Sequence, residues 1–260
     1  MSSLNVKVLG CSGGIGGVEL QTTSILVGEQ TLIDAGTGVS ALTLEQLSAI
    51  NNLYLTHSHM DHIALCPMLI DSTYDSRQKP LRINALKSTI EDLNKHIFNW
   101  KIWPNFSEIV IDGAPQQEIH TISVGQSFAL EGGGEIVVGP AKHQVPSCSY
   151  LIIGKNKKLF FSGDTSYTSD IVSFIKDHEP VEHVILECAF SNKEKKIAKL
   201  SEHMCTEGVL KIISEIGENH NFYITHLKPS QRDLIMDEIL GEKINGMEIS
   251  RLFSYQVFSL

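Results

Sequence analysis

Short apolar runs separated by turn residues fill the first third of the chain. Runs of this length that are rich in Val, Ile, Leu and Tyr and bounded by Gly, Ser, Asn or Asp are typical of β-strands. They cover residues 6–10, 24–27, 31–36 and 52–57. Residues 39–50 instead carry apolar side chains at spacings compatible with one helical face, which predicts a helix between the third and fourth strands.

The middle of the chain, residues 118–162, is rich in β-branched and aromatic runs broken by three glycines, which predicts a strand meander. After it, helical and strand patterns alternate up to residue 226. Ser88 with Glu91, and Ser230 with Asp233, form capping boxes that predict two further helix starts.

No repeat period and no low-complexity linker interrupts these patterns. The sequence therefore predicts one α/β (α+β) domain over residues 1–260. In this domain a pair of sheets is sandwiched by helices.

Composition narrows the functional classes. Apolar residues make up 42% of the chain and charged residues 20%, which is ordinary for a globular protein and excludes disorder, collagen and coiled coil. No apolar run approaches the roughly 20 residues of a membrane helix, and no leader pattern precedes the first strand, so we expect a cytoplasmic protein without membrane contact. The five cysteines lack a CxxC pair, which fits free thiols and argues against a cysteine-only zinc site.

The eleven histidines include one dense cluster. An apolar strand over residues 53–55 ends in the pattern HxHxDH, formed by His57, His59, Asp61 and His62. Side chains two residues apart on an extended backbone point to the same side, and the last two residues lie where a helix would begin. Since one zinc needs only three protein ligands plus water, four ligands in six residues predict two divalent metal ions.

Two metals need further ligands from elsewhere in the chain. Three residues qualify because each lies beside an apolar strand, where a sheet edge presents side chains rigidly to a cleft. They are His143, Asp164 and His226.

With these motifs in order, namely THSHMDH, His143, SGDT and ITHLKP, the sequence resembles the metallo-β-lactamase superfamily over nearly its whole length. The resemblance implies an αβ/βα four-layer sandwich with two mixed sheets flanked by helices and a helical, cap-like segment around residues 66–107. It assigns His57, His59 and His143 to one zinc, and Asp61, His62 and His226 to the other. Asp164 would bridge both ions, and Asp34 of LIDAG would support the site by hydrogen bonds. Manganese or iron could replace zinc at such ligands.

A glycine-rich stretch follows the first strand at residues 9–17. Its spacing is not GxGxxG and no P-loop lysine follows, so nucleotide phosphate binding of those types is not supported. We expect a tight loop beside the metal cleft, where the resemblance also places it.

Within the superfamily, the stretches at residues 96–106, 187–210 and 224–230 resemble class II 3′,5′-cyclic-nucleotide phosphodiesterases. Met60 and Leu65 depart from that family's first motif. The resemblance implies hydrolysis of cAMP or cGMP to nucleoside 5′-monophosphates. The alternatives are a tRNA 3′-processing endonuclease (RNase Z), another phosphodiesterase, hydrolysis of a β-lactam or thioester, and a metal-binding protein without turnover.

Charge favours the cyclic nucleotide. With 30 acidic and 21 basic residues the formal charge is −9, and two divalent ions would raise it only to −5. A positive pocket in an acidic shell suits a small phosphodiester and makes nucleic acid an unfavourable partner. The lysines around residues 193–199 are interpreted as a solvated surface.

The expected mechanism uses a hydroxide that bridges the metals as nucleophile. Asp61 would orient it, and His203 would protonate the leaving sugar oxygen as general acid. The alternative for His203 is to cap the helix that begins near Thr206. Aromatic residues over 98–106 could stack a base or pack internally, and their apolar stripe predicts a homodimer.

Overall fold

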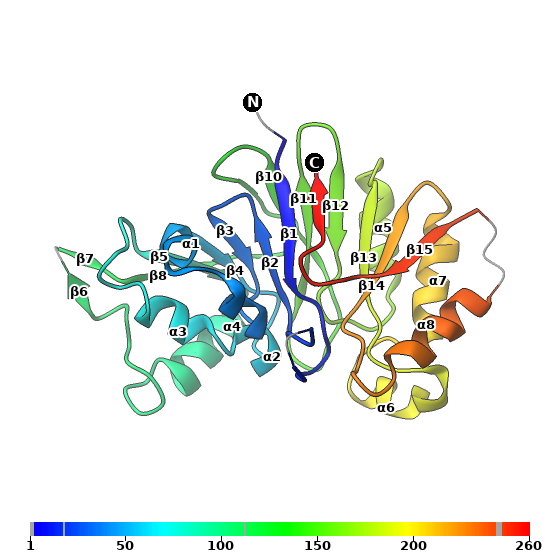
Figure 1. Ribbon diagram of the computed structural model, residues 1–260, viewed down its shortest axis with the longest axis horizontal. Coiled ribbons are helices and arrows are strands. Elements are labelled where there is room, and N and C mark those ends of the chain that lie inside the picture. Colours follow the sequence, from blue (N-terminus) through cyan, green and yellow to red (C-terminus); the bar gives the residue numbers. More distant parts are fainter. Residues whose placement is uncertain (1–2, 18, 112, 243–245) are drawn as a thin grey trace.

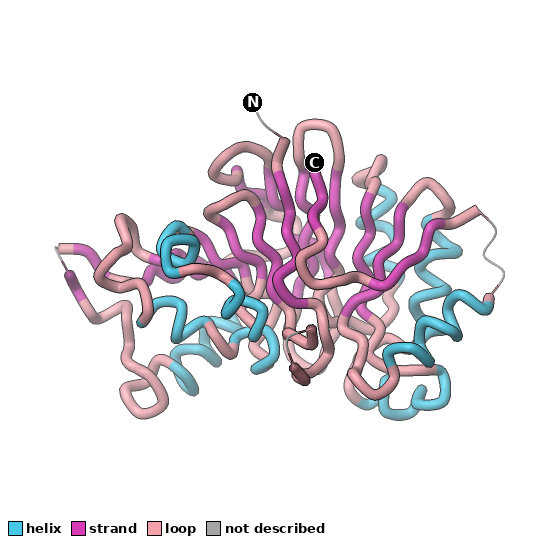
Figure 2. Tube along the Cα trace, viewed as in Figure 1, coloured by secondary structure: helices cyan, strands magenta, loops and turns pink. Residues whose placement is uncertain are grey.

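The computed structural model describes residues 3–17, 19–111, 113–242 and 246–260. In this part of the chain, two seven-stranded sheets face each other and helices cover their outer faces (Figures 1 and 2). In spatial order the first sheet contains β16 (Val257–Ser259), β1 (Asn5–Gly10), β2 (Ser24–Val27), β3 (Thr31–Ile33), β4 (Asn52–Tyr54), β5 (Leu81–Ala85) and β8 (Gln117–Thr121). The second contains β15 (Glu248–Arg251), β14 (Asn221–Thr225), β13 (His183–Glu187), β12 (Lys158–Phe161), β11 (Cys148–Ile153), β10 (Glu135–Pro140) and β9 (Ser127–Ala129).

The helices divide between the two halves of the sequence. Those of the first half are η1 (Thr37–Ala41), α1 (Leu44–Ala49), α2 (Met60–Ile63), α3 (Cys66–Asp71), α4 (Lys87–Asp92) and the π-helical turn η2 (Leu93–Ile97). Those of the second are α5 (Ser169–Asp177), η3 (Asn192–Glu194), α6 (Lys195–Leu200), α7 (Thr206–Ile216) and α8 (Arg232–Gly241). A small ribbon of β6 (Val110–Ile111) and β7 (Ala114–Pro115) lies apart from both sheets. None of the helices in the described residues has the length and apolarity needed to cross a bilayer.

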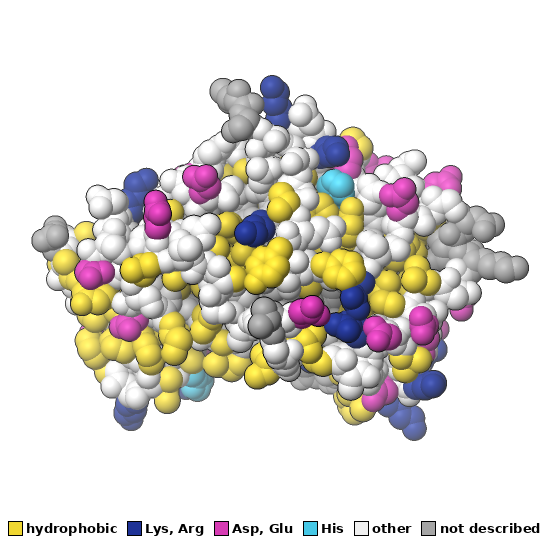
Figure 3. Space-filling model, viewed as in Figure 1, with side chains coloured by type: hydrophobic (Ala, Val, Ile, Leu, Met, Phe, Trp, Pro, Cys, Tyr) yellow, Lys and Arg dark blue, Asp and Glu magenta, His cyan; other side chains and the backbone are white. Residues whose placement is uncertain are grey.

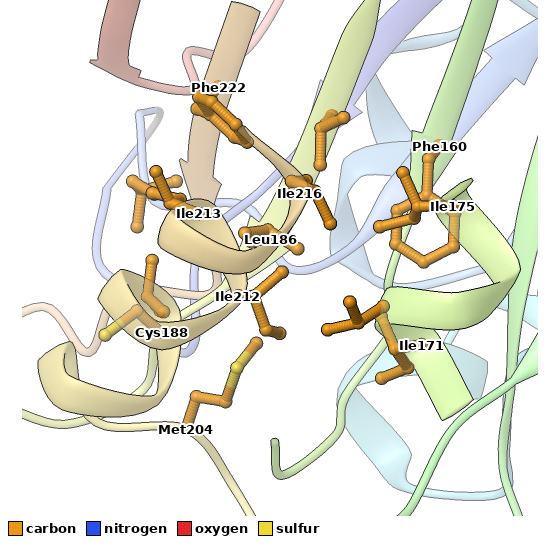
Figure 4. Close-up of a cluster of buried hydrophobic side chains, with 14 of the residues drawn as sticks. Phe160, Ile171, Ile175, Leu186, Cys188, Met204, Ile212, Ile213, Ile216 and Phe222 are labelled. Carbon is orange, nitrogen blue, oxygen red and sulfur yellow. The ribbon is translucent and has the colours of Figure 1, made fainter. Parts of the chain in front are cut away.

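Side-chain alternation along the strands builds three hydrophobic layers. In β10, Ile136 and Val138 point into the core between the sheets, whereas Val137 points outward toward the helices. The outward layer of the second sheet packs on α5 and α7, and Figure 4 shows Ile212 and Ile216 of α7 among these side chains. A matching layer separates the first sheet from its own helices. The predicted four-layer sandwich is confirmed.

Some predicted elements differ in the structure. Residues 118–121 belong to β8, which runs parallel to β5 in the first sheet, so the meander begins only at β9. The parallel pairing with β5 places this strand in the first sheet. The local sequence pattern predicts a strand here but does not show which strand it pairs with. The segment over residues 66–107 also contributes β5, so it is helical only in part.

Neither predicted capping box forms. Helix α4 begins after Leu86 and α8 after Gln231, both without a side-chain cap. Among the described residues, a capping box forms instead between Thr43 and Gln46 at the start of α1. Tertiary contacts thus place helix starts one or two residues away from the local signal.

Candidate metal centre

The HxHxDH motif lies where β4 gives way to a short helix. The strand ends at Tyr54, His57 follows in the loop, and His59 occupies the N-cap position of α2. Asp61 and His62 then lie in the first turn of that helix. The strand-to-helix change therefore gathers the four side chains at one end of the sandwich.

The three ligands predicted from distant segments join them. His143 follows β10, Asp164 follows β12 and His226 follows β14. Asp164 lies at the centre: its Oδ2 is 3.7 Å from Nε2 of His57, and its Oδ1 is 3.3 Å from Nε2 of His62 and 3.2 Å from Nδ1 of His226. Nε2 of His143 lies 3.1 Å from Nδ1 of His59.

These side chains form two groups in which one possible ligand atom per residue lies within 4.8 Å of all the others. The first group is His57, His59, His143 and Asp164, and the second is Asp61, His62, Asp164 and His226. Asp164 is the residue shared by both, as its expected bridging position requires.

The donor atoms fit divalent metal ions. Nε2 of His57, Nε2 of His62 and both ring nitrogens of His226 are buried and have no hydrogen-bond partner. Buried nitrogens of this kind are costly unless they are bound. Imidazole and carboxylate together are a donor set that zinc, manganese and iron accept. The geometry is that of two groups of possible metal ligands that share one carboxylate.

Asp34 and Thr56 hold two of the histidines in position. Oδ2 of Asp34 lies 2.7 Å from Nδ1 of His62, and Oδ1 of Asp34 accepts from the backbone N–H of Thr56 at 2.8 Å. The Thr56 hydroxyl lies 2.9 Å from Nδ1 of His57. Contacts at Nδ1 leave Nε2 free for a metal, which is the usual role of such outer partners. Thr56 is a supporting residue that the sequence did not reveal.

Burial and charge set the protonation of the ligands. Burial, together with the neighbouring His62, holds the pKa of His57 well below its usual value, and burial lowers the pKa of His226 to about 3. Both rings are therefore neutral and able to bind metal. At His62, burial opposes protonation, but Asp164 and Asp34 outweigh it and hold the pKa well above its usual value. A divalent cation in place of that proton would satisfy the same carboxylates.

His203 lies beside the two metal-binding groups and pairs with a buried glutamate. Its ring stacks on His226, with centroids 5.1 Å apart, and its Nδ1 lies 2.8 Å from Oε1 of Glu187. Glu187 also accepts backbone N–H bonds from Thr165 and Ala189. Since a carboxylate only accepts, Nδ1 of His203 carries the proton and its Nε2 remains free. Despite burial, Glu187 raises the pKa of His203.

Glu187 was not among the candidates from the sequence. It is the last residue of the apolar strand β13, so it lies at the end of a buried strand, close to where Asp164 lies relative to β12. That position is the signal that could have identified it. Helix α7 does begin at Thr206, but its N-cap is Cys205, so His203 does not cap it.

The glycine-rich loop borders the metal centre. A Cβ atom on Gly13 would lie 2.3 Å from the carbonyl oxygen of His226, so only glycine allows this approach.

The aromatic residues over 98–106 differ in burial. Phe98 and Phe106 are buried against each other, whereas Trp100 is 59% exposed. Internal packing therefore accounts for the two phenylalanines.

Comparison with known proteins adds a family and several relatives. The profile of the β-lactamase superfamily domain matches residues 30–227. A probable 3′,5′-cyclic-nucleotide phosphodiesterase of Yersinia pestis is 28% identical over 77% of this chain, which spans 65% of that relative, less than two thirds of its length. A 3′,5′-cyclic-nucleotide phosphodiesterase of Aliivibrio fischeri is 24% identical over 99% of this chain and 92% of its own.

A ribonuclease Z of Haloarcula marismortui is 21% identical over 91% of each chain. Among solved structures, unliganded yeast PDE1 superposes with a TM-score of 0.80 at 16% identity and covers 100% of both chains. At 16% identity the superposition shows that the two proteins share a fold, and a shared fold does not by itself identify a substrate.

Proposed function

Because this chain belongs to the β-lactamase superfamily, we propose that it is a metal-dependent hydrolase, namely a dinuclear zinc phosphodiesterase that hydrolyses 3′,5′-cyclic nucleotides. The observation that carries the proposal is the pair of metal-binding groups joined by Asp164, with the His203–Glu187 pair beside them. Two relatives named as cyclic-nucleotide phosphodiesterases support the substrate class.

The chain's own residues supply binding, orientation and proton transfer. Metal ions held by the two groups would polarise the phosphate and make a nucleophile available near neutral pH. The Asp61 carboxylate is 30% exposed whereas that of Asp164 is 3% exposed, so Asp61 faces the substrate side and can accept a hydrogen bond from the attacking water. Asp34 and Thr56 hold the imidazole rings of His62 and His57 in place.

His203 is the proposed general acid for the sugar 3′-oxygen that leaves. Its Nδ1 is fixed on Glu187, and its Nε2 can deliver a proton to the leaving oxygen. Because Glu187 raises the pKa of His203, the imidazole stays protonated to higher pH than a free histidine. The residue therefore acts as an acid at the pH where the nucleophile is also available.

Replacing Glu187 with Gln is expected to move the alkaline limb of the pH–rate profile to lower pH. A general acid works only when protonated, so the rate falls as pH rises through the pKa of His203. Loss of the Glu187 charge lowers that pKa and brings the fall earlier. The profile of kcat/KM from pH 5 to 10 measures the shift, with Glu215→Gln as control. An unmoved alkaline limb would count against His203 as the acid.

A substrate panel tests the proposed function. Zinc-loaded protein is incubated with cAMP, cGMP, bis(p-nitrophenyl) phosphate and a precursor tRNA, and products are separated by chromatography. We expect nucleoside 5′-monophosphates from the cyclic nucleotides. Cleavage of the precursor tRNA with inert cyclic nucleotides would replace the proposal by its alternative.

That alternative, a tRNA 3′-processing nuclease, is favoured by the relative named ribonuclease Z and by one pocket. A cavity of about 550 Å³ has His203 in its wall and four lysines around it, namely Lys142, Lys195, Lys199 and Lys211. Two of these lysines already have partners: Lys195 pairs with Glu207, and Lys211 lies over the Tyr167 ring. The chain's charge of −9 still favours a small phosphodiester.

A homodimer and a cytoplasmic location complete the proposal. The five cysteines are free, which suits a reducing compartment. Trp100 and Ile102 are 59% and 64% exposed, and Figure 3 shows hydrophobic side chains gathered around the neighbouring β6, β7 and α3. Such a patch marks an interaction surface.

Light scattering after gel filtration is expected to give twice the chain mass for the natural protein. Ile102→Glu places a charge in the apolar contact and is expected to give a monomer, whereas Val124→Glu, at another exposed apolar position, should leave the dimer intact. A monomer mass for the natural protein would contradict the dimer.

A further inference from the structure

A second pocket is lined by Ser12 and Leu227, which are the chain neighbours of Gly13 and His226 beside the metal centre. It has a volume of about 510 Å³ and is formed by the segment after β1, the start of α8 and the chain between β15 and β16. Figure 3 shows the face on which β15 and α8 lie, with hydrophobic side chains at its centre and basic ones beside them. Its principal lining residues are Ser12, Leu227, Arg232, Arg251, Phe253 and Tyr255. None of the six belongs to the proposed metal ligands.

Two arginines converge at this pocket. Nε of Arg232 and a terminal nitrogen of Arg251 both lie 3.5 Å from the same oxygen of Asp233, whose side chain is 82% exposed. An exposed carboxylate at that distance is a weak partner. Nε of Arg232 is buried and makes no hydrogen bond. The two guanidinium groups therefore share one solvated carboxylate and have unused donors.

The pocket also contains an unpaired polar group deep in its wall. Ser12 is 6% exposed, and its hydroxyl has no hydrogen-bond partner. A buried hydroxyl without a partner is destabilising, and a ligand atom could supply the missing hydrogen bond. Glu19 also lines the pocket, but it is exposed at the surface.

The remaining wall is apolar and aromatic. Phe253 and Tyr255 are about half exposed, which is unusual for aromatic side chains that pack only internally. The Arg251 guanidinium lies 4.6 Å from the centroid of the Phe253 ring, so the cation is held against an aromatic face. Leu227 completes the apolar side.

We propose that this pocket is a second binding site, specific for a small organic anion with an aromatic body. Guanidinium groups recognise phosphate, sulfonate and carboxylate oxygens by paired hydrogen bonds, and the aromatic wall recognises a planar ring. The inference does not depend on the proposed function, because no lining residue used here takes part in catalysis.

An occupant would also touch the supports of the metal centre. The Gly13 N–H donates to the Leu227 carbonyl at 3.1 Å, and the His226 N–H donates to the Cys11 carbonyl at 2.9 Å. Ser12 and Leu227 therefore lie next to the residues that fix His226. A ligand at this pocket is placed to influence the second metal group by linkage.

Isothermal titration of the metal-loaded protein with naphthalene-2-sulfonate tests the site. The sulfonate is an anion on an aromatic body and a poor metal ligand. Inorganic sulfate and 2-naphthalenemethanol supply the two parts separately. We expect the sulfonate to bind at least about tenfold more tightly than either, since both parts contribute to its recognition.

Arg251→Met and Arg232→Met are each expected to weaken sulfonate binding about tenfold, with unchanged metal content and melting temperature. Arg82→Met is the matched control, because this arginine pairs with Glu118 on the first sheet. Unchanged affinity in both test variants, or equal affinity for sulfate and the sulfonate, would overturn the proposal. Retention of binding in Asp61→Asn would show separately that the ligand is not held at the metal centre.

Discussion

Replacing Asp164 with Ala is expected to lower turnover by roughly a thousandfold or more and to reduce bound metal below two equivalents. Its two carboxylate oxygens lie within 3.2 to 3.7 Å of nitrogens from His57, His62 and His226. No other described residue is shared by both metal-binding groups. Loss of this one carboxylate therefore weakens both sites together.

Metal content by plasma mass spectrometry and hydrolysis of cAMP are the two measurements. Asp177→Ala, at the exposed end of α5, is the control and should retain both properties. His59→Ala provides a useful contrast, since His59 belongs to one group only and its loss should spare the second. Two equivalents of metal and full activity in the Asp164 variant would show that this residue bridges nothing.

His203→Ala is expected to lower kcat by about 10²- to 10⁴-fold while metal content stays at the natural level. The side chain lies outside both metal-binding groups, so its removal leaves the donor atoms in place. A proton donor matters most when the leaving group is a poor one. The loss should therefore be large for cAMP and small for bis(p-nitrophenyl) phosphate, whose phenolate leaves without protonation.

That difference between substrates separates acid catalysis from a structural effect. If His203 only packs against His226, its removal should disturb the centre equally for both substrates. His120→Ala is the control, because this imidazole is 48% exposed and lies away from the centre. Equal losses on both substrates would remove His203 from the mechanism and leave it as a positioning residue.

The sequence by itself predicted the architecture, which the structure confirms, and the residues that are proposed as metal ligands. Short apolar runs bounded by turn residues located most strands, and the alternation of side chains along each strand separates the layers of the sandwich. The motif HxHxDH carries its chemistry in six consecutive residues, so it could be recognised without any knowledge of distant contacts. His143, Asp164 and His226 each follow an apolar strand, and the structure brings all three to that motif.

Only the tertiary structure decided which residues support that centre. Glu187 and Thr56 are ordinary residues in the sequence. Glu187 acquires a role because folding brings the end of β13 to 2.8 Å from Nδ1 of His203, and Thr56 because the pairing of β3 with β4 places its hydroxyl 2.9 Å from Oδ2 of Asp34. The proposed anion pocket also depends on tertiary structure, because Ser12, Arg232 and Arg251 come from three segments that are distant in the sequence. A local pattern records which face of an element is apolar, whereas contacts between segments depend on strand order and register, and these are fixed only when the sheets pack.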